Sequence, residues 1–163
     1  MILQRLQDNG FTVNPLKCEW CVQETDWLSH WLTPTGTKPW RKKIEPLLNL
    51  AVPKMTTQVR SFISAVTFYH DFWRKRSHVL APLTAIVGKT NKNKNKPFEW
   101  TTECDRAFNE AKALLAADVL LRYPDPKLPY HIYTDASDLQ LGSVIMQQDA
   151  PVAFFWSSAN AGT

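Results

Sequence analysis

The sequence predicts an α+β fold, in which a mainly helical centre lies between two small groups of strands. Apolar residues recur at three- and four-residue spacing through the middle of the chain, which is typical of helices with one buried face. Short alternating stretches bounded by turn residues come before and after that part, which is typical of strands. With 163 residues, 44% of them hydrophobic, the chain is long and apolar enough to form packed structure.

The first part of the chain predicts one short helix followed by strands. A helix is predicted over residues 2–9, because Gly10 is a residue that commonly ends helices. The stretch FTVNPLKCEWC, residues 11–21, predicts two short strands around an Asn-Pro turn. The stretch DWLSHWLTPTG, residues 26–36, predicts one more strand that ends in a turn.

Four helices are predicted in the centre. Pro39 is expected to open the first, which runs to about Leu50, and Thr56 or Thr57 to cap the second. The apolar stripe of the second helix consists of Val59, Phe62, Ile63, Val66, Tyr69 and Trp73. The third helix covers about residues 78–87. Thr101 is expected to cap the fourth, whose apolar face is Cys104, Ala107, Phe108, Ala111, Leu114 and Leu115.

The last part of the chain predicts three strands after the Pro-rich connector YPDPKLP. They cover residues 130–134, 141–147 and 152–156. Asp135 directly follows the first of them. An Asp in such a corner commonly bonds nearby backbone N–H groups, and the alternative is that it is one ligand of a metal site.

Charge is strongly partitioned along the chain. Residues 38–96 hold 13 Lys and Arg but only two acidic residues, whereas the whole chain has a net charge of only +4. Such a block is ordinarily a solvated face, but this asymmetry also favours a polyanionic partner. Within it, GKTNKNKNKP has no apolar residue to bury and predicts a linker.

Cysteine content and hydropathy exclude other classes of protein. Cys18, Cys21 and Cys104 are too few for a disulfide framework, and no second pair completes the Cys18-x-x-Cys21 half of a zinc site. Partly buried cysteines on strands are the favoured interpretation. No apolar run approaches the length of a membrane span, and the N-terminus becomes polar too early for a signal peptide, so we expect an intracellular chain without membrane contact.

Six motifs occur in an order that resembles gypsy-type LTR-retrotransposon Pol polyproteins. They are TVNPLKCEW, WLSHWLTPTGTKP, VRSFISAVTFYHDFW, HVLAPLTAIVGK, FEWTTECDRAFNEAKALL and LPYHIYTDASDLQLGSVIMQ. The resemblance implies the end of a reverse transcriptase palm at 1–37 and a helical thumb at 38–88. A linker at 89–97 and a connection helix with the start of an RNase H domain at 98–163 would follow. Partners would include the rest of the polyprotein.

The resemblance assigns roles to two parts of the palm segment. Lys17 aligns with the palm lysine close to the phosphates of the incoming nucleotide, although from the residues alone it is a surface lysine. Leu28, Ser29, His30 and Trp31 align with the primer grip, a tight strand turn that holds the primer terminus. Ser29 stands where the family usually has Gly.

The basic centre resembles the thumb, which contacts the backbone of an RNA–DNA hybrid or a DNA duplex. A helical unit with one apolar and one basic side can neutralise phosphates without reading sequence. A further departure is Ser64, at a position where the family usually has Gly. The candidate phosphate contacts are Lys42, Lys43, Arg60, Arg74, Lys75 and Arg76.

Through the resemblance, Asp135 aligns with the first catalytic carboxylate of RNase H. That reaction uses two Mg²⁺ ions held by several carboxylates. The family's next two ligands follow the three opening strands, beyond Thr163, and no Asp-Asp pair for a polymerase site occurs in the sequence. The chain therefore holds one metal ligand, Asp135, and is not expected to bind Mg²⁺ stably.

Two further functions remain open beside that of a reverse transcriptase–RNase H segment. The basic block is compatible with a non-catalytic, sequence-independent nucleic-acid-binding module. The partial sheets are compatible with a degenerate remnant, because both leave open edges.

The first prediction concerns catalysis. We expect the purified chain with Mg²⁺ to show neither primer extension nor cleavage of an RNA–DNA hybrid, because the carboxylates for both reactions are missing. Cleavage by the chain that disappears in Asp135→Asn would contradict this expectation.

Overall fold

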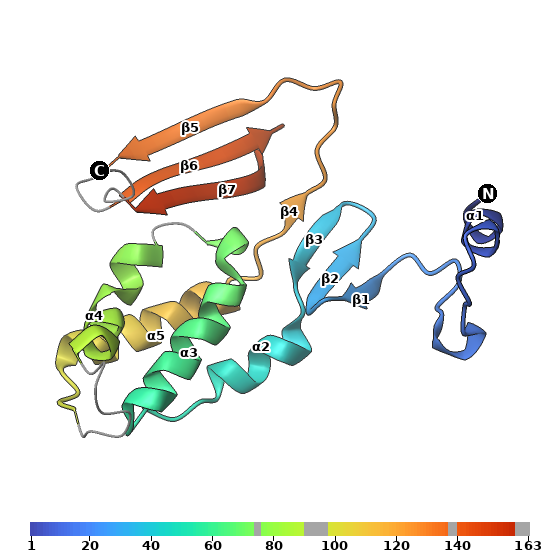
Figure 1. Ribbon diagram of the computed structural model, residues 1–163. Helices are drawn as coiled ribbons and strands as arrows, with labels where there is room; N and C mark the ends of the chain where they lie inside the picture. Colours follow the sequence, from blue (N-terminus) through green and yellow to red (C-terminus); the bar gives the residue numbers. More distant parts are fainter. Residues whose placement is uncertain (74–75, 90–97, 137–139, 159–163) are drawn as a thin grey trace.

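A helical centre lies between two small antiparallel sheets, and a short N-terminal helix stands apart from the rest (Figure 1). The structure is a computed structural model that describes residues 1–73, 76–89, 98–136 and 140–158. This arrangement confirms the predicted α+β class. Within the described ranges, no helix has both the length and the apolar character needed to cross a membrane.

The N-terminal segment contains a helix and a turn. Helix α1 (Ile2–Asp8) ends before Gly10, which has a left-handed φ of 74°, as predicted. The strands predicted for residues 11–21 are wrong, because this fully described stretch forms the 3₁₀ turn η1 (Pro15–Lys17). The Asn14 side chain accepts a hydrogen bond from the Leu16 N–H at 3.0 Å and so caps the turn. Cys18 and Cys21 consequently lie outside strands, and Cys21 is exposed.

The first sheet is built from a hairpin, a third strand and a distant fourth strand. Its order is β1 (Thr25–Trp27), β2 (His30–Thr33), β3 (Gly36–Pro39) and β4 (Leu121–Arg122). The single strand predicted for residues 26–36 is wrong, because the chain reverses at Leu28 and Ser29. Pro39 ends β3 rather than opening a helix, and it pairs with His30 across the sheet.

The central helices form where apolar periodicity predicts them. They are α2 (Arg41–Leu48), α3 (Thr56–Phe68), the 3₁₀ turn η2 (His70–Phe72), α4 (Arg76–Lys89) and α5 (Thr102–Ala116). Thr101 caps α5 as predicted, with its side chain accepting from the Cys104 N–H at 3.3 Å. The predicted threonine cap of α3 is wrong. Met55 is the N-cap, and the Gln58 side chain accepts from the backbone N–H groups of Lys54 and Met55.

One hydrophobic core unites α2, α3, η2, α4, α5 and β4. The rings of Phe62 and Phe108 meet at its centre with centroids 4.5 Å apart. The stripe of α3 continues past the helix end, so that Tyr69 and Trp73 are also buried. Helix α5 follows the Lys/Asn-rich segment in sequence and packs beside α3 and α4 (Figure 1). The predicted linker at 89–97 lies outside the described residues except for Lys89.

The second sheet is the predicted three-stranded meander, with order β5 (His131–Ala136), β6 (Gln140–Gln147) and β7 (Ala150–Ser158). One face turns toward the helices, where Trp156 lies edge-on to His70 with ring centroids 5.9 Å apart. Phe154 on the same face packs against the core. Strand β5 forms the outer edge of this sheet, and its residues are exposed.

The second prediction concerns Gly36, which pairs with Arg122 where β3 meets β4. A Cβ atom at this position would overlap the Leu121 carbonyl oxygen, and backbone cannot yield as a side chain can. We expect Gly36→Ala to lower the free energy of unfolding by about 2 kcal/mol in urea titrations.

Gly88→Ala is the matched control, because Gly88 lies in α4 with nothing within 4 Å of the added atom. It should be neutral or stabilising by up to ~1 kcal/mol. Equal stability of the two variants would contradict the strand pairing.

Candidate nucleic-acid interface

The hairpin between β1 and β2 turns within two residues. Leu28 and Ser29 both have left-handed φ values, 48° and 66°, as two-residue hairpin turns require. The Leu28 carbonyl oxygen lies 2.8 Å from His30 Nδ1, and the Ser29 carbonyl accepts from the Trp40 N–H at 3.1 Å. The residues predicted to form a tight strand turn therefore do form one, although their contact with a primer stays a prediction.

The hairpin is docked on the end of α3 by aromatic contacts. The His30 ring lies 5.7 Å from the ring of Phe68 and 5.5 Å from that of Phe72, measured between centroids. The His30 ring also lies edge-on to the Tyr69 ring, with centroids 6.1 Å apart. Burial raises the pKa of Tyr69 above its ordinary value of 10.0, and the neighbouring Ser29 side chain offsets part of that rise. The hairpin and the helix end thus meet at a cluster of aromatic rings.

A groove opens beside this docking contact. It has a volume of about 440 Å³ and is lined by Ser29, Lys43, Leu47, Ser64, Ala65, Phe68 and Tyr69. Ser29 and Ser64 are the two positions at which the motifs depart from the expected Gly, and the structure brings both to this groove. The lining residues come from α2, from α3 and the residue that follows it, and from the hairpin turn through Ser29.

The start of α2 carries the cations nearest the hairpin. The ammonium groups of Lys42 and Lys43 lie 5.7 Å and 5.8 Å from the centroid of the Trp40 ring. Trp40 is the N-cap of α2, and its backbone N–H donates to the Ser29 carbonyl. The same residue therefore contacts the hairpin turn and both ammonium groups. Both lysines are exposed, and their charges are available to a polyanion.

The structure brings only some of the predicted residues together. The hairpin turn and Lys43 share the groove, while Arg60 is half-buried nearer the start of α3. Lys17 is exposed on η1, in the N-terminal segment that lies away from the helices (Figure 1). Arg74, Lys75 and the side chain of Arg76 lie outside the described residues.

Asp135 lies on the exposed edge strand β5, opposite Gly142 of β6. Among the residues that the structure describes, no three or more His, Cys, Asp or Glu side chains gather as a metal site would require. RNase H-like and reverse transcriptase families generally use divalent metal, and a two-metal centre needs several carboxylates. The described residues therefore do not assemble such a centre around Asp135, whose role as a metal ligand stays a prediction.

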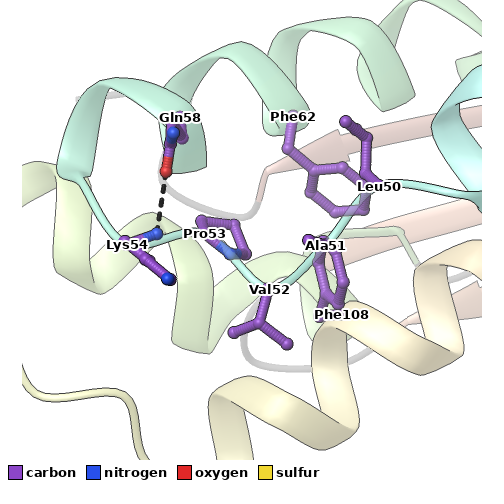
Figure 2. Close-up of a pocket in the computed structure, with 8 residues that line it drawn as sticks. All are labelled: Leu50, Ala51, Val52, Pro53, Lys54, Gln58, Phe62 and Phe108. Carbon is purple, nitrogen blue, oxygen red and sulfur yellow. Dashed lines mark hydrogen bonds between the residues drawn. The ribbon is translucent and has the colours of Figure 1, made fainter.

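A second pocket is separate from the groove. It has a volume of about 260 Å³ and is formed mainly by the loop between α2 and α3, together with Phe62 of α3 and Phe108 of α5 (Figure 2). The hydrogen bond from the Lys54 N–H to the Gln58 side chain closes one side. No predicted site residue lines this pocket, and its walls are mostly apolar.

Sequence reasoning missed Tyr69 and Trp40 as parts of the interface. Tyr69 was expected to be a core residue, and it is only 3% exposed. A buried tyrosine generally needs a partner for its hydroxyl, which is the signal that could have drawn attention to it. Ser29, which lines the same groove, is distant in the sequence and could not be found by local pattern.

The third prediction is an alkaline loss of stability. Since the pKa of Tyr69 is raised in the folded state, the unfolded chain loses this proton first as the pH rises above about 10. The free energy of unfolding is therefore fully retained below that pH and falls as the pH rises through the folded pKa. Urea titrations between about pH 8 and pH 11 should show a shallower decline for Tyr69→Phe.

Tyr123→Phe is the matched control for this measurement, because Tyr123 is 48% exposed and should leave the decline unchanged. An equal decline in wild type and Tyr69→Phe would contradict the burial of the phenol.

Comparisons with known proteins support the resemblance seen in the motifs. Residues 100–161 match the family described as the RNase H-like domain found in reverse transcriptase. The chain is 28% identical over 160 residues to the retrovirus-related Pol polyprotein from transposon 297 of Drosophila melanogaster, covering 98% of this chain and 15% of that protein. It is 31% identical over 157 residues to the corresponding polyprotein from transposon 412 of the same species, covering 94% of this chain and 12% of that protein.

Solved structures of foamy viral protease-reverse transcriptase have a similar fold. The complex with RNA/DNA hybrid matches with a TM-score of 0.80 and 20% identity, over 98% of this chain and 22% of that chain. The complex with dsDNA matches with a TM-score of 0.79 and 18% identity, over 98% of this chain and 33% of that chain. The predicted resemblance to gypsy-type LTR-retrotransposon Pol polyproteins, with reverse transcriptase and RNase H-like parts, is thus confirmed over nearly the whole chain.

Proposed function

We propose that this chain supplies a sequence-independent surface for a nucleic-acid duplex within a reverse transcriptase–RNase H polyprotein. One observation carries the proposal: Ser29 of the hairpin turn and Lys43 of α2 line a single groove. Lysines placed this way neutralise backbone phosphates and release counterions without contact to base edges. A polymerase must accept any template, so this kind of contact fits the proposed role.

The proposed partner is an RNA–DNA hybrid or a DNA duplex. The structural relatives are foamy viral enzymes in complex with these two kinds of nucleic acid, which supports the choice. Because the chain spans only 12–15% of the length of the curated relatives, DNA synthesis and hybrid cleavage are proposed for the longer polyprotein. In that polyprotein Lys17 would lie near nucleotide phosphates, and Asp135 would be the first RNase H carboxylate with Mg²⁺ as the metal.

A second candidate is duplex binding without catalysis. The absence of a carboxylate cluster among the described residues favours it for the chain by itself. Both candidates use the same groove, so one binding measurement supports either. Primer-extension and hybrid-cleavage assays of the longer polyprotein that contains this segment separate them.

The fourth prediction tests the cations of α2. A double variant, Lys42→Ala with Lys43→Ala, should bind a 20-base-pair duplex more weakly than wild type at low salt. Its plot of log affinity against log salt should be flatter, by about 0.9 for each phosphate that the variant no longer neutralises. Fluorescence anisotropy with a labelled duplex at several salt concentrations measures both quantities.

Lys127→Ala is the control for nonspecific loss of charge, because Lys127 is exposed on the loop between β4 and β5. Its salt slope should equal that of wild type. A double variant that keeps the wild-type slope would assign Lys42 and Lys43 to an ordinary solvated surface.

A further inference from the structure

The side chain of Gln147, at the end of β6, is buried although it is polar. It is 5% exposed and bonds the connector YPDPKLP, residues 123–129, which leads from β4 to β5 (Figure 1). The Gln147 Oε1 accepts from the Asp125 N–H at 2.9 Å. The Gln147 Nε2 donates to the Asp125 carbonyl at 2.9 Å and to the Leu128 carbonyl at 3.0 Å. The side-chain amide therefore binds the connector through both of its polar atoms.

The connector forms a compact turn between Asp125 and Leu128. The Asp125 side chain accepts from the Lys127 N–H at 2.9 Å, and the Asp125 carbonyl accepts from the Leu128 N–H at 3.1 Å. On the other side, the Gln147 backbone is fixed in the hairpin of β6 and β7, opposite Ala150. Gln147 therefore joins a fixed strand to the turn that leads into β5.

The register of β5 against β6 is not set by burial. All residues of β5 are exposed, and a register is specified weakly where neither face of a strand is buried. In the observed register Asp135 lies opposite Gly142, and Gly142 lies opposite Trp156. These positions share the face that turns toward His70 and the helices. A slip of one residue would move Asp135 to the opposite face.

We propose that Gln147 is a positioning residue for Asp135: its hold on the connector fixes where β5 begins, and hence the face on which the Asp135 carboxylate lies. His131, the first residue of β5, pairs with Met146, directly before Gln147. The Leu128 carbonyl that Gln147 binds comes shortly before His131 in the sequence. This inference rests on the proposed role of Asp135 as an RNase H carboxylate.

The alternative is that Gln147 only satisfies buried backbone groups and stabilises the whole sheet. A general loss of stability weakens the pairing of β6 with β7 as much as that of β5 with β6. A positioning role weakens β5 first, because the connector leads directly into that strand. Glutamate at position 147 is the informative substitution, because it keeps the size of the side chain and removes both N–H donors.

The fifth prediction is that Gln147→Glu loosens β5 while the chain stays folded. Amide hydrogen exchange of the full chain, measured by NMR, should become about 25-fold faster at the β5 amides bonded to β6, since each of the two lost hydrogen bonds is worth about fivefold. Exchange in α3 and α5 should not change. Nuclear Overhauser contacts between Asp135 and Gly142 report the register directly and should weaken.

Gln148→Glu is the matched control, because Gln148 is exposed between β6 and β7 and undergoes the same change of charge. Exchange in β5 should then equal that of wild type. Gln147→Met is a second variant, which removes the hydrogen bonds without placing a charge in a buried site, and it should also accelerate exchange in β5. Circular dichroism checks that each variant is folded.

Activity separates positioning of Asp135 from a purely structural role. In the longer polyprotein that contains this segment, Gln147→Glu should lower kcat for hybrid cleavage by roughly tenfold or more, as expected for a displaced reacting group. The KM for the hybrid should not change, because the groove is not altered. Primer extension by the same variant should equal that of wild type, whereas a general loss of folding would reduce both reactions.

Two outcomes would overturn the positioning role while the proposed function stands. One is wild-type exchange of β5 in folded Gln147→Glu and Gln147→Met chains, and the other is faster exchange with a wild-type kcat. If Asp135→Asn instead cleaves the hybrid as fast as the wild-type polyprotein, the proposed role of Asp135 fails and the positioning role fails with it. The exchange data identify this case, because they report the hold of Gln147 on the connector without any activity.

Discussion

The contact between the rings of Phe62 and Phe108 is the interaction on which the rest of the structure depends. It joins α3 to α5, two helices separated in the sequence by the Lys/Asn-rich stretch GKTNKNKNKP. The ring centroids are 4.5 Å apart, and both side chains are almost fully buried. Burying a phenylalanine side chain contributes roughly 2–3 kcal/mol, so this pair is a large part of what holds the two helices together. The Trp100 ring packs on Phe108 at 5.8 Å and extends the contact to the start of α5.

The same packing brings the candidate interface together. Because α5 fixes α3 in the core, the buried stripe of α3 continues without interruption to Tyr69 and Phe72. The His30 ring of the hairpin packs against both of those residues. Strand β4 follows α5 in the chain and pairs with β3 at Gly36. The first sheet therefore contacts the helical centre through β4 as well as through the hairpin. The groove is therefore a consequence of core packing between segments that are far apart in sequence.

The helices and the final meander could be predicted because their information is local. The three- and four-residue spacing of apolar positions identifies α3 and α5, and Thr101 marks the start of α5 through a side-chain cap. Alternation identifies β5, β6 and β7 in the same way. The β3–β4 pairing could not be predicted, because it joins Thr37 to Leu121 and depends on the missing Cβ of Gly36. The strands expected for residues 11–21 failed because the side chain of Asn14 favours a local turn.

The site was predictable to a similar degree. Motif order drew attention to the turn residues and to Lys43, but the groove that Ser29 and Lys43 share depends on tertiary packing of the hairpin against the end of α3. The most direct test of this account is amide hydrogen exchange of the chain with and without a duplex, measured by peptide mass spectrometry. The account predicts added protection at residues 28–31 and 41–47 together, with no change at 131–136. Protection confined to the second sheet, or present at only one of the two predicted segments, would contradict it.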